Sequence, residues 1–364
     1  MTEIQAVLCG YYGKGNGGDE ALLVSMLEML PSHVKPLVLS ADPRATSKSY
    51  GVRSYDRMNS GAVIRALKES QILILGGGSL IQDATSIRNS IYYGGLIGLA
   101  QQFGLQTFAI AQGIGPLNKP LTRWIAKRAF SSCTALSVRD PASAALLEQW
   151  GLSSLMAPDP VWSLAATPVP ELASIPSPKI AVTLRSHPKL TNERLEILTR
   201  ALVDLQAATG SHVLLVPFQP TTDLDIARQI QAELTDNSQV VTLTDPKRLK
   251  GLFQGVDLAI GMRYHSLIMA AAEGCKCWAI SYDPKVSKLM TEIGLPGWEL
   301  ADIPTDAGAI TQAWQQHLET GTALSHESVH NLNQTSLAHK NLLSSAINNL
   351  SSWQRKVRSW GFPQ

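Results

Sequence analysis

The sequence is poor in features that mark specialised classes of protein. Its 364 residues hold only four cysteines, Cys9, Cys133, Cys275 and Cys277, which excludes a disulfide-built scaffold and fits reduced thiols in a cytosolic protein. No apolar run approaches the roughly 18–20 residues that a membrane-spanning helix needs. The first ten residues lack the basic start and apolar core of a signal peptide, so we expect a cytoplasmic protein.

The net charge is also small. The 31 Lys and Arg residues nearly balance the 29 Asp and Glu residues, which gives no support for a nucleic-acid partner or a polybasic membrane anchor. The eight histidines form no His-Glu-x-x-His pair or facial triad, so we expect no metal site. The remaining composition is ordinarily globular, and the length suggests two domains of about 100–200 residues each.

Short apolar runs alternate with helix-compatible stretches along the whole chain. Because these runs are apolar throughout, they fit strands buried on both faces of a parallel sheet. In the first half we expect strands at Ala6–Cys9, Leu37–Ser40, Ile72–Leu75, Thr107–Ala111 and Ala135–Val138. In the second half we expect them at Ile180–Leu184, Val213–Val216, Val240–Leu243, Leu258–Ile260 and Trp278–Ser281.

A proline-rich stretch interrupts this rhythm and predicts a domain boundary. We expect an α/β protein of two Rossmann-like, doubly wound domains facing a cleft, with residues 1–165 and 179–325 as the domains. Residues 166–178 would be the linker, and residues 326–364 would form closing helices. In such sheets ligands bind beyond the carboxyl ends of the strands, so the loops there are the candidates for chemistry.

Two glycine-rich loops follow expected strands of the first domain. Gly10–Glu20 could hold an anion or a sugar edge on helix-start amides, or it could be only a tight turn. Gly76–Asp83 could bring bare backbone to a ligand, with Asp83 as a base for a sugar hydroxyl, or its glycines could serve packing. The candidates for ligand contacts in these loops, which the family resemblance given below assigns to a sugar acceptor, are Tyr11, Tyr12, Lys14, Asn16, Asp19, Gly77, Gly78, Ser79 and Gln82.

Three further segments end strands at the same expected edge. Gln112–Pro116 could line the cleft or form a turn. Arg139 ends a strand in the first expected domain, where it could point into the cleft or pair with Asp140 or Glu148, and Arg185 raises the same alternatives in the second.

The sharpest signal is Arg263-Tyr264-His265-Ser266, which follows the strand Leu258–Ile260 and opens an apolar helix. Arginine offers a bidentate fork to carboxylate or phosphate, and histidine exchanges protons near neutral pH. A capped helix with a buried structural histidine is the alternative interpretation.

These segments, in this order, resemble the polysaccharide pyruvyl transferase family, and most of all its CsaB-type members. The matching pieces are Gly10–Glu20, Gly76–Asp83, Gln112–Pro116, Ser137–Asp140, Asp159-Pro160, Arg263–Ser266 and Glu273-Gly274. The resemblance implies a GT-B-like fold. It also implies transfer of pyruvate from phosphoenolpyruvate to a sugar of a cell-wall or exopolysaccharide precursor, with formation of a cyclic ketal and release of phosphate.

The resemblance also implies residue roles. Arg263 and His265 would be catalytic, and Arg139, Arg263, Ser266 and Arg185 would bind the donor. Asp83 would correspond to the family's acidic residue. No cofactor is expected beyond phosphoenolpyruvate as substrate. The acceptor would be lipid-linked or nucleotide-linked, which could bring the protein to the inner face of the membrane, and the sequence leaves a homo-oligomer open.

Two other functions fit parts of the same pattern. A GT-B glycosyltransferase or a sugar-nucleotide epimerase would place a nucleotide in the second half, with Glu273 on its ribose. A sugar-binding protein without activity would keep the architecture but show no turnover. Release of phosphate from phosphoenolpyruvate distinguishes a pyruvyl transferase from both.

Overall fold

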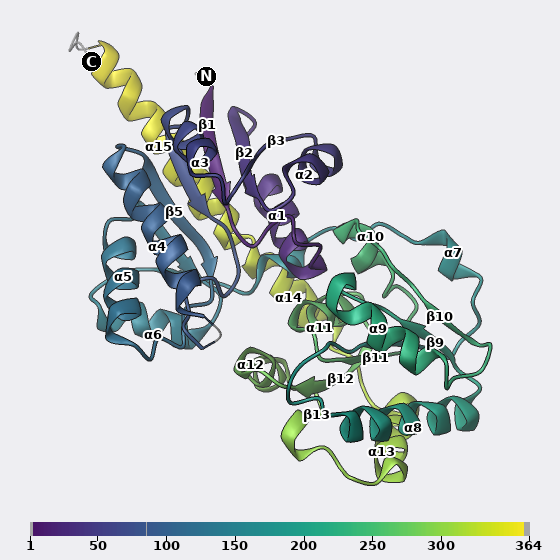
Figure 1. Ribbon diagram of the computed structural model, residues 1–364. Coiled ribbons are helices and arrows are strands. Elements are labelled where there is room, and N and C mark those ends of the chain that lie inside the picture. The colour runs from purple at the N-terminus through teal and green to yellow at the C-terminus, as the bar shows by residue number, and fades with distance from the viewer. Residues whose placement is uncertain (1–2, 85, 360–364) are drawn as a thin grey trace. The chain divides into compact units, whose positions relative to one another are not determined.

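The computed structural model describes residues 3–84 and 86–359, with side chains up to residue 349, and it divides into two compact units (Figure 1). The first unit contains residues up to 14, residues 19–163 and the chain from Leu332 onward. The second contains residues 15–18 and 164–331. The chain therefore passes to the second unit after Ser163 and returns to the first near its end.

The first unit is built on a seven-stranded parallel sheet with strand order β3-β2-β1-β4-β5-β6-β7. Its strands are β1 (Ile4–Cys9), β2 (Val34–Ser40), β3 (Arg53–Asp56), β4 (Ile72–Leu75), β5 (Gln106–Gln112), β6 (Ala135–Val138) and β7 (Leu155–Met156). The two edge strands, β3 and β7, were not expected from the sequence. Both are short and partly exposed, so neither shows the fully apolar run of a central strand.

Helices cover both faces of this sheet. They are α1 (Gly17–Met29), α2 (Pro43–Tyr50), α3 (Ser60–Lys68), α4 (Ile87–Gln102), α5 (Pro120–Ser131), α6 (Pro141–Gln149), α14 (His326–Ser336) and α15 (Ala338–Ser359). Successive residues of β1 enter two separate cores: Val7 and Cys9 pack with α3, α4 and α5, whereas Ala6 and Leu8 pack with α1 and α15. This burial on both sides explains why the strand is apolar throughout.

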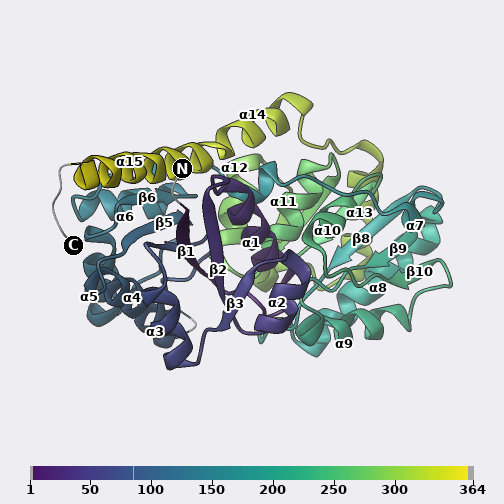
Figure 2. The same cartoon turned by 90° about the horizontal axis from the view of Figure 1, so that it is seen from above.

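The C-terminal helix α15 lies along the first unit in Figure 2, where it contacts β5, β6 and β7. Leu343 and Ile347 bury their side chains in the core shared with α1. His339, fully buried, also anchors the helix. Its Nδ1 lies 2.9 Å from Ser137 Oγ and its Nε2 lies 3.0 Å from the Pro158 carbonyl oxygen.

The second unit repeats the plan with six parallel strands in the order β10-β9-β8-β11-β12-β13. These are β8 (Lys179–Thr183), β9 (His212–Leu215), β10 (Ser238–Val240), β11 (Leu258–Gly261), β12 (Lys276–Ser281) and β13 (Gly297–Glu299). Its helices are α7 (Pro170–Ala173), α8 (Asn192–Thr209), α9 (Pro220–Gln231), α10 (Pro246–Gly251), α11 (Tyr264–Ala272), α12 (Pro284–Ile293) and α13 (Ala307–Thr320), with short 3₁₀ turns η1 (Pro160–Ser163) in the first unit and η2 (Leu300–Asp302) in the second.

Each sheet has the strand order of a doubly wound fold, counted from its own first strand, so the expected pair of Rossmann-like domains is confirmed. The stretch 166–178, expected as a linker, contains the short helix α7. Among residues 3–84 and 86–359, no helix is long and apolar enough to cross a membrane.

Candidate active site

Arg263 ends the loop after β11 and directly precedes α11. It is buried, and its guanidinium is held by side chains from the start of α9. Its Nε donates to Asp223 Oδ2 at 3.1 Å, and its NH2 group donates both to Asp223 Oδ1 and to Thr222 Oγ1, the latter at 3.0 Å. The remaining NH1 group lies 3.5 Å from Gln219 Oε1, which is a long contact. Asp223 therefore fixes one edge of the fork and leaves the NH1 edge weakly engaged.

His265 lies in the first turn of α11 and is half-buried. A β-carbon on Gly18 would stand 2.2 Å from its Nδ1 atom, so the imidazole packs directly against glycine backbone. Gly17, next to it, donates its backbone N–H to the Phe218 carbonyl at 2.7 Å. Gly18, which belongs to the second unit, is thus a neighbour of His265. This glycine pair was expected to bind the acceptor, and its packing against His265 was not expected from the sequence.

The other residues predicted to bind the donor in the second unit have mainly structural contacts. Ser266 is buried, and its hydroxyl donates to the Arg263 carbonyl at 2.7 Å and lies 2.7 Å from Thr183 Oγ1. It therefore fixes the turn that carries Arg263. Arg185 donates to the Tyr282 hydroxyl at 2.7 Å and lies over the same ring at 5.0 Å.

In the first unit, three predicted segments meet around Arg139. Its NH1 group is paired with Asp159, and its NH2 group donates to Ser79 Oγ at 3.0 Å. A β-carbon on Gly113 would lie 3.2 Å from Arg139 Nε, so the guanidinium rests on bare backbone. Backbone bonds from Gly113 to the Gly78 carbonyl and from Arg139 to the Gln112 carbonyl complete the junction. The glycine-rich loop, the Gln112–Pro116 turn and Arg139 therefore form one cluster.

The first glycine-rich loop contains both exposed and buried side chains. Lys14 is exposed, Tyr11 and Asp19 are half-buried, and Asn16 accepts the Gly18 N–H at 3.1 Å. Tyr12 is instead fully buried, and a β-carbon on Gly76 would lie 1.9 Å from its hydroxyl. Its burial gives no support to the prediction that Tyr12 contacts the acceptor, because the ring packs in the core beneath the loop.

The second glycine-rich loop is constrained mainly by packing. A β-carbon on Gly77 would lie 2.8 Å from Leu22 Cδ2, whereas Gly78 needs its positive φ of 126°. The carbonyl of Gln82, whose side chain is nearly buried, accepts the Ser90 hydroxyl at 2.9 Å. The packing interpretation therefore accounts for Gly77 without a ligand.

Asp83 holds the start of α5. Its carboxylate accepts the Asn118 N–H at 2.9 Å, the Lys119 N–H at 2.8 Å and the Thr122 hydroxyl at 2.6 Å. Burial raises the pKa of this carboxyl, but these three hydrogen bonds and the charge of Lys119 lower it further, so the net pKa lies below its ordinary value. A carboxylate held in this way is a weak base, and its contacts give it a structural role.

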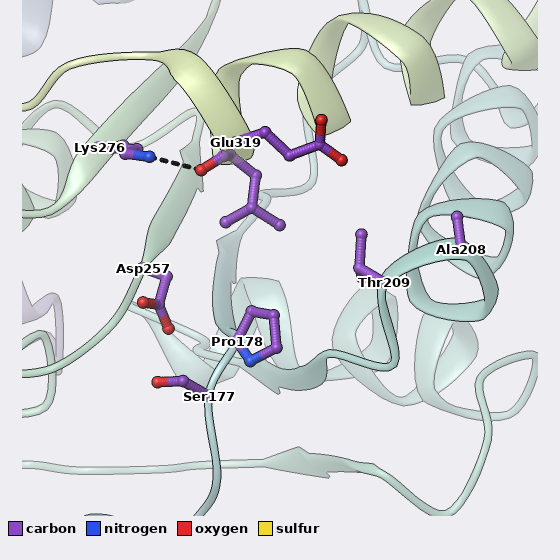
Figure 3. Close-up of a pocket in the computed structure, with 8 residues that line it drawn as sticks. Ser177, Pro178, Ala208, Thr209, Asp257, Lys276 and Glu319 are labelled. Atoms are coloured by element: carbon purple, nitrogen blue, oxygen red, sulfur yellow. Dashed lines mark hydrogen bonds between the residues drawn. The ribbon is translucent and has the colours of Figure 1, made fainter.

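The second unit also contains a cavity that none of the predicted site residues lines. It encloses about 450 Å³ at the amino ends of β8, β11 and β12, and Asp257, Lys276 and Glu319 are among its lining residues (Figure 3). Lys276 donates to the Leu318 carbonyl across its rim. Since ligands of doubly wound sheets bind at the carboxyl ends of the strands, we do not place the active site in this cavity.

Glu273, the residue that a nucleotide ribose would need, also lies away from the carboxyl ends. It caps the far end of α11, where it accepts Gln254 Nε2 at 2.9 Å and lies 3.8 Å from Lys250 Nζ. Across the part of the chain that the structure describes, no three His, Cys, Asp or Glu side chains gather as metal ligands.

Sequence reasoning missed the partners of the two buried arginines. Asp223 follows β9 at the start of α9, which is the carboxyl end of a predicted strand, so its position could have been found from the topology. Asp159 lies in a proline-flanked turn after β7, a strand that the sequence did not reveal.

The comparisons with solved structures describe the fold. The chain is similar to the UDP-GlcNAc 2-epimerase from Methanocaldococcus jannaschii, with 8% identity over 94% of this chain and 99% of the other, and a TM-score of 0.64. A UDP-GlcNAc 2-epimerase from Neisseria meningitidis matches with 9% identity over 97% and 100% of the two chains and a TM-score of 0.57. A glycosyltransferase from Rickettsia africae matches with 13% identity over 98% and 99%, and a TM-score of 0.53.

At such low identities these likenesses establish a GT-B-like fold and nothing about activity. A search of curated protein sequences found no match. The model of one family, polysaccharide pyruvyl transferase, matches residues 16–284, which is more than half of the chain and includes both Arg139 and Arg263. With this match and the fold together, the chain belongs to the polysaccharide pyruvyl transferase family of transferases.

Proposed function

We propose that the protein transfers pyruvate from phosphoenolpyruvate to two hydroxyls of one sugar in a cell-wall or exopolysaccharide precursor. The observation that carries this proposal is the arrangement of Arg263 and His265 at the carboxyl end of β11, inside the stretch matched by the family. The fixed guanidinium suits an anionic donor, and the half-buried imidazole beside it suits proton transfer.

The proposed reaction has three steps: addition of a hydroxyl, loss of phosphate and closure of the ketal ring. The oxygen of one sugar hydroxyl adds to C2 of phosphoenolpyruvate and releases its proton to solvent, while C3 takes a proton from His265, which solvent then reprotonates, and becomes a methyl group. The C2–O bond to phosphate then breaks, phosphate leaves with the bonding electrons, and an oxocarbenium-like centre remains. A second hydroxyl of the same sugar attacks C2 and loses its proton, which gives the cyclic ketal and inorganic phosphate.

In this scheme His265 donates the proton to C3, and Arg263 binds the carboxylate or phosphate of the donor through its weakly engaged NH1 edge. Arg139 is the second predicted cation for the donor. The prediction that Asp83 is the base finds no support in its contacts, since three donors already occupy its carboxylate. The residues need no cofactor for these steps, and phosphoenolpyruvate is the only donor.

The acceptor in this proposal is a lipid-linked or nucleotide-linked sugar met in the cytoplasm. Residues of the two glycine-rich loops that remain accessible, such as Tyr11, Lys14 and Asn16, are its proposed contacts. Tyr12 and Gly77 are withdrawn from that set because both are engaged in packing.

The test follows phosphate release and product mass with phosphoenolpyruvate and a panel of acceptors. His265→Ala should lower kcat by roughly 10²–10⁴, the usual contribution of a positioned acid–base group. Arg263→Lys should lower donor kcat/KM by roughly 10–150-fold, because the ammonium lacks the planar fork. His330→Ala, which changes an exposed histidine of α14, is the matched control and should leave both values unchanged.

A GT-B glycosyltransferase or a sugar-nucleotide epimerase would give a different product pattern. A nucleoside diphosphate would appear, or a sugar nucleotide would change configuration, with no consumption of phosphoenolpyruvate. That outcome would exclude the proposed reaction, whereas full activity in both variants would exclude the roles given to His265 and Arg263.

A further inference from the structure

A third buried arginine, Arg57, lies at the carboxyl end of the first sheet. It follows β3 and is 7% exposed, and its backbone N–H donates to the Ser40 carbonyl at the end of β2 at 3.0 Å. Its guanidinium donates from NH1 to the Gly10 carbonyl and from NH2 to the Tyr93 hydroxyl, each at 3.0 Å. Arg57 therefore joins β3 and α4 to the first residue of the glycine-rich loop.

Aromatic rings surround this guanidinium. Its central carbon lies 4.8 Å from the ring centroid of Tyr92, 5.3 Å from that of Tyr93 and 5.8 Å from that of Tyr11. The Tyr92 hydroxyl in turn donates to the Arg57 carbonyl at 2.9 Å. The ring faces attract the cation electrostatically, so all three tyrosines help to hold the buried guanidinium in place.

Arg57 differs from Arg139 and Arg263 in its charge balance. Each of those arginines is paired with a buried aspartate, whereas Arg57 forms no ion pair with any carboxylate among the side chains described, residues 3–84 and 86–349. Burying a cation is costly unless its donors are satisfied. Neutral hydrogen-bond acceptors and the faces of tyrosine rings compensate the buried charge of Arg57. One of these hydrogen-bond acceptors, the Gly10 carbonyl, belongs to the glycine-rich loop.

A second buried charge holds the middle of the same loop. Glu20, in the first turn of α1, is 7% exposed and accepts the Gly13 N–H at 2.8 Å and the Tyr50 hydroxyl at 2.9 Å. Gly13 has φ of 74°, and a β-carbon there would lie 2.0 Å from Ser40 Oγ. The loop backbone is thus fixed at a carbonyl by a cation and at an N–H by an anion, on either side of Tyr11 and Tyr12.

We propose that Arg57 is a positioning residue for acceptor binding. It preorganises the backbone of residues 10–14 and the ring of Tyr11. The accessible side chains of the loop therefore contact the sugar acceptor without a prior ordering of the loop. Preset contacts lower the entropic cost of binding, and their loss appears in the acceptor KM rather than in the chemical step. This inference rests on the proposed function for the identity of the acceptor.

The experiment combines amide hydrogen exchange in the free protein with steady-state kinetics. Arg57→Lys keeps the charge but cannot reach both acceptors with a planar fork, and Tyr93→Phe removes only one hydroxyl. Arg53→Lys is the matched control, because Arg53 is an exposed arginine on the same strand with its own tyrosine contact at 5.8 Å.

Arg57→Lys should speed amide exchange within residues 10–14 and raise the acceptor KM about 10-fold, which corresponds to a loss of about 1.4 kcal/mol. The donor KM should stay the same and kcat should stay within about 2-fold. Tyr93→Phe should show the same pattern at about 3-fold, as one neutral contact is lost. Arg53→Lys should match the wild type.

An unchanged exchange pattern in both variants overturns the inference, even if phosphoenolpyruvate is consumed. So does an acceptor KM that stays at the wild-type value while the exchange changes. Faster loop exchange in a protein whose wild type never consumes phosphoenolpyruvate overturns the proposed function instead, because exchange is measured without substrate.

Discussion

The two sheets each bury one arginine–aspartate pair at their carboxyl ends, and the pairs are built differently. Arg139 contacts Asp159 and Ser79 and rests on Gly113, so its partners come from three distant segments of the chain. The Arg263 guanidinium donates to Asp223, Thr222 and Gln219, which all lie at the start of α9.

The two ion pairs therefore differ in what they stabilise. Arg139 connects loops that are distant in the sequence. Its loss should therefore lower the stability of the first unit and also remove any contact with the donor. Arg263 is oriented by one neighbouring turn and lies two residues before His265, so its loss should affect activity more than folding.

Breaking either pair at its aspartate should have the largest effect. Asp223→Asn and Asp159→Asn should each lower the free energy of unfolding by about 3–5 kcal/mol, because a buried guanidinium loses its counter-charge. The joint replacement Arg263→Met with Asp223→Leu should recover most of this stability while donor kcat/KM stays low. Arg139→Met with Asp159→Leu should recover less, because Arg139 also joins the distant segments that contain Ser79 and Gly113. Chemical denaturation and kinetics measure both quantities, and equal recovery in the two units would contradict the distinction.

The hydroxyl groups that accept hydrogen bonds from the two arginines allow a second comparison, with smaller expected effects. Thr222→Val and Ser79→Ala each remove an acceptor from an arginine, a hydrogen bond to a charged group that contributes about 1.5–3 kcal/mol. We expect Thr222→Val to lower Tm and also to lower donor kcat/KM about 10-fold, because a loss of about 1.4 kcal/mol in donor binding corresponds to tenfold. Ser79→Ala should chiefly lower Tm. A reversed pattern would mean that Arg139 is the principal donor contact.

Replacement of Asp83 should have the smallest effect on stability, and that effect should depend on pH. Asp83→Asn should lower the free energy of unfolding by about 1 kcal/mol at neutral pH, since the amide retains an acceptor but loses the charge. Because the pKa of Asp83 is lowered in the folded state, its carboxylate stabilises the fold above the ordinary value of 3.8, and this stability is lost as the pH falls through the lowered pKa. The Tm difference should therefore shrink in acid, while kcat stays within about 2-fold of wild type at neutral pH. A large loss of kcat without a loss of Tm would restore Asp83 as the base.

The sequence by itself determined the two doubly wound sheets and the segments that end their strands. Central strands such as Ile72–Leu75 are apolar at every position because both faces are buried, and this pattern is local enough to be seen without coordinates. The motif Arg263–Ser266 was visible for a similar reason, since polar residues at a strand end interrupt an otherwise apolar stretch. The edge strands β3 and β7 were missed because partial exposure removes that contrast.

Only the tertiary structure decided which charged groups are paired. Asp159 and Asp223 lie 20 and 40 residues from their arginines, and no local pattern links such positions. The same holds for Asp83, whose partners come from residues 118–122, and for Arg57, which reaches back to Gly10. Pairing of buried charges depends on distances set by the whole sheet, whereas strand and helix patterns depend on neighbours along the chain.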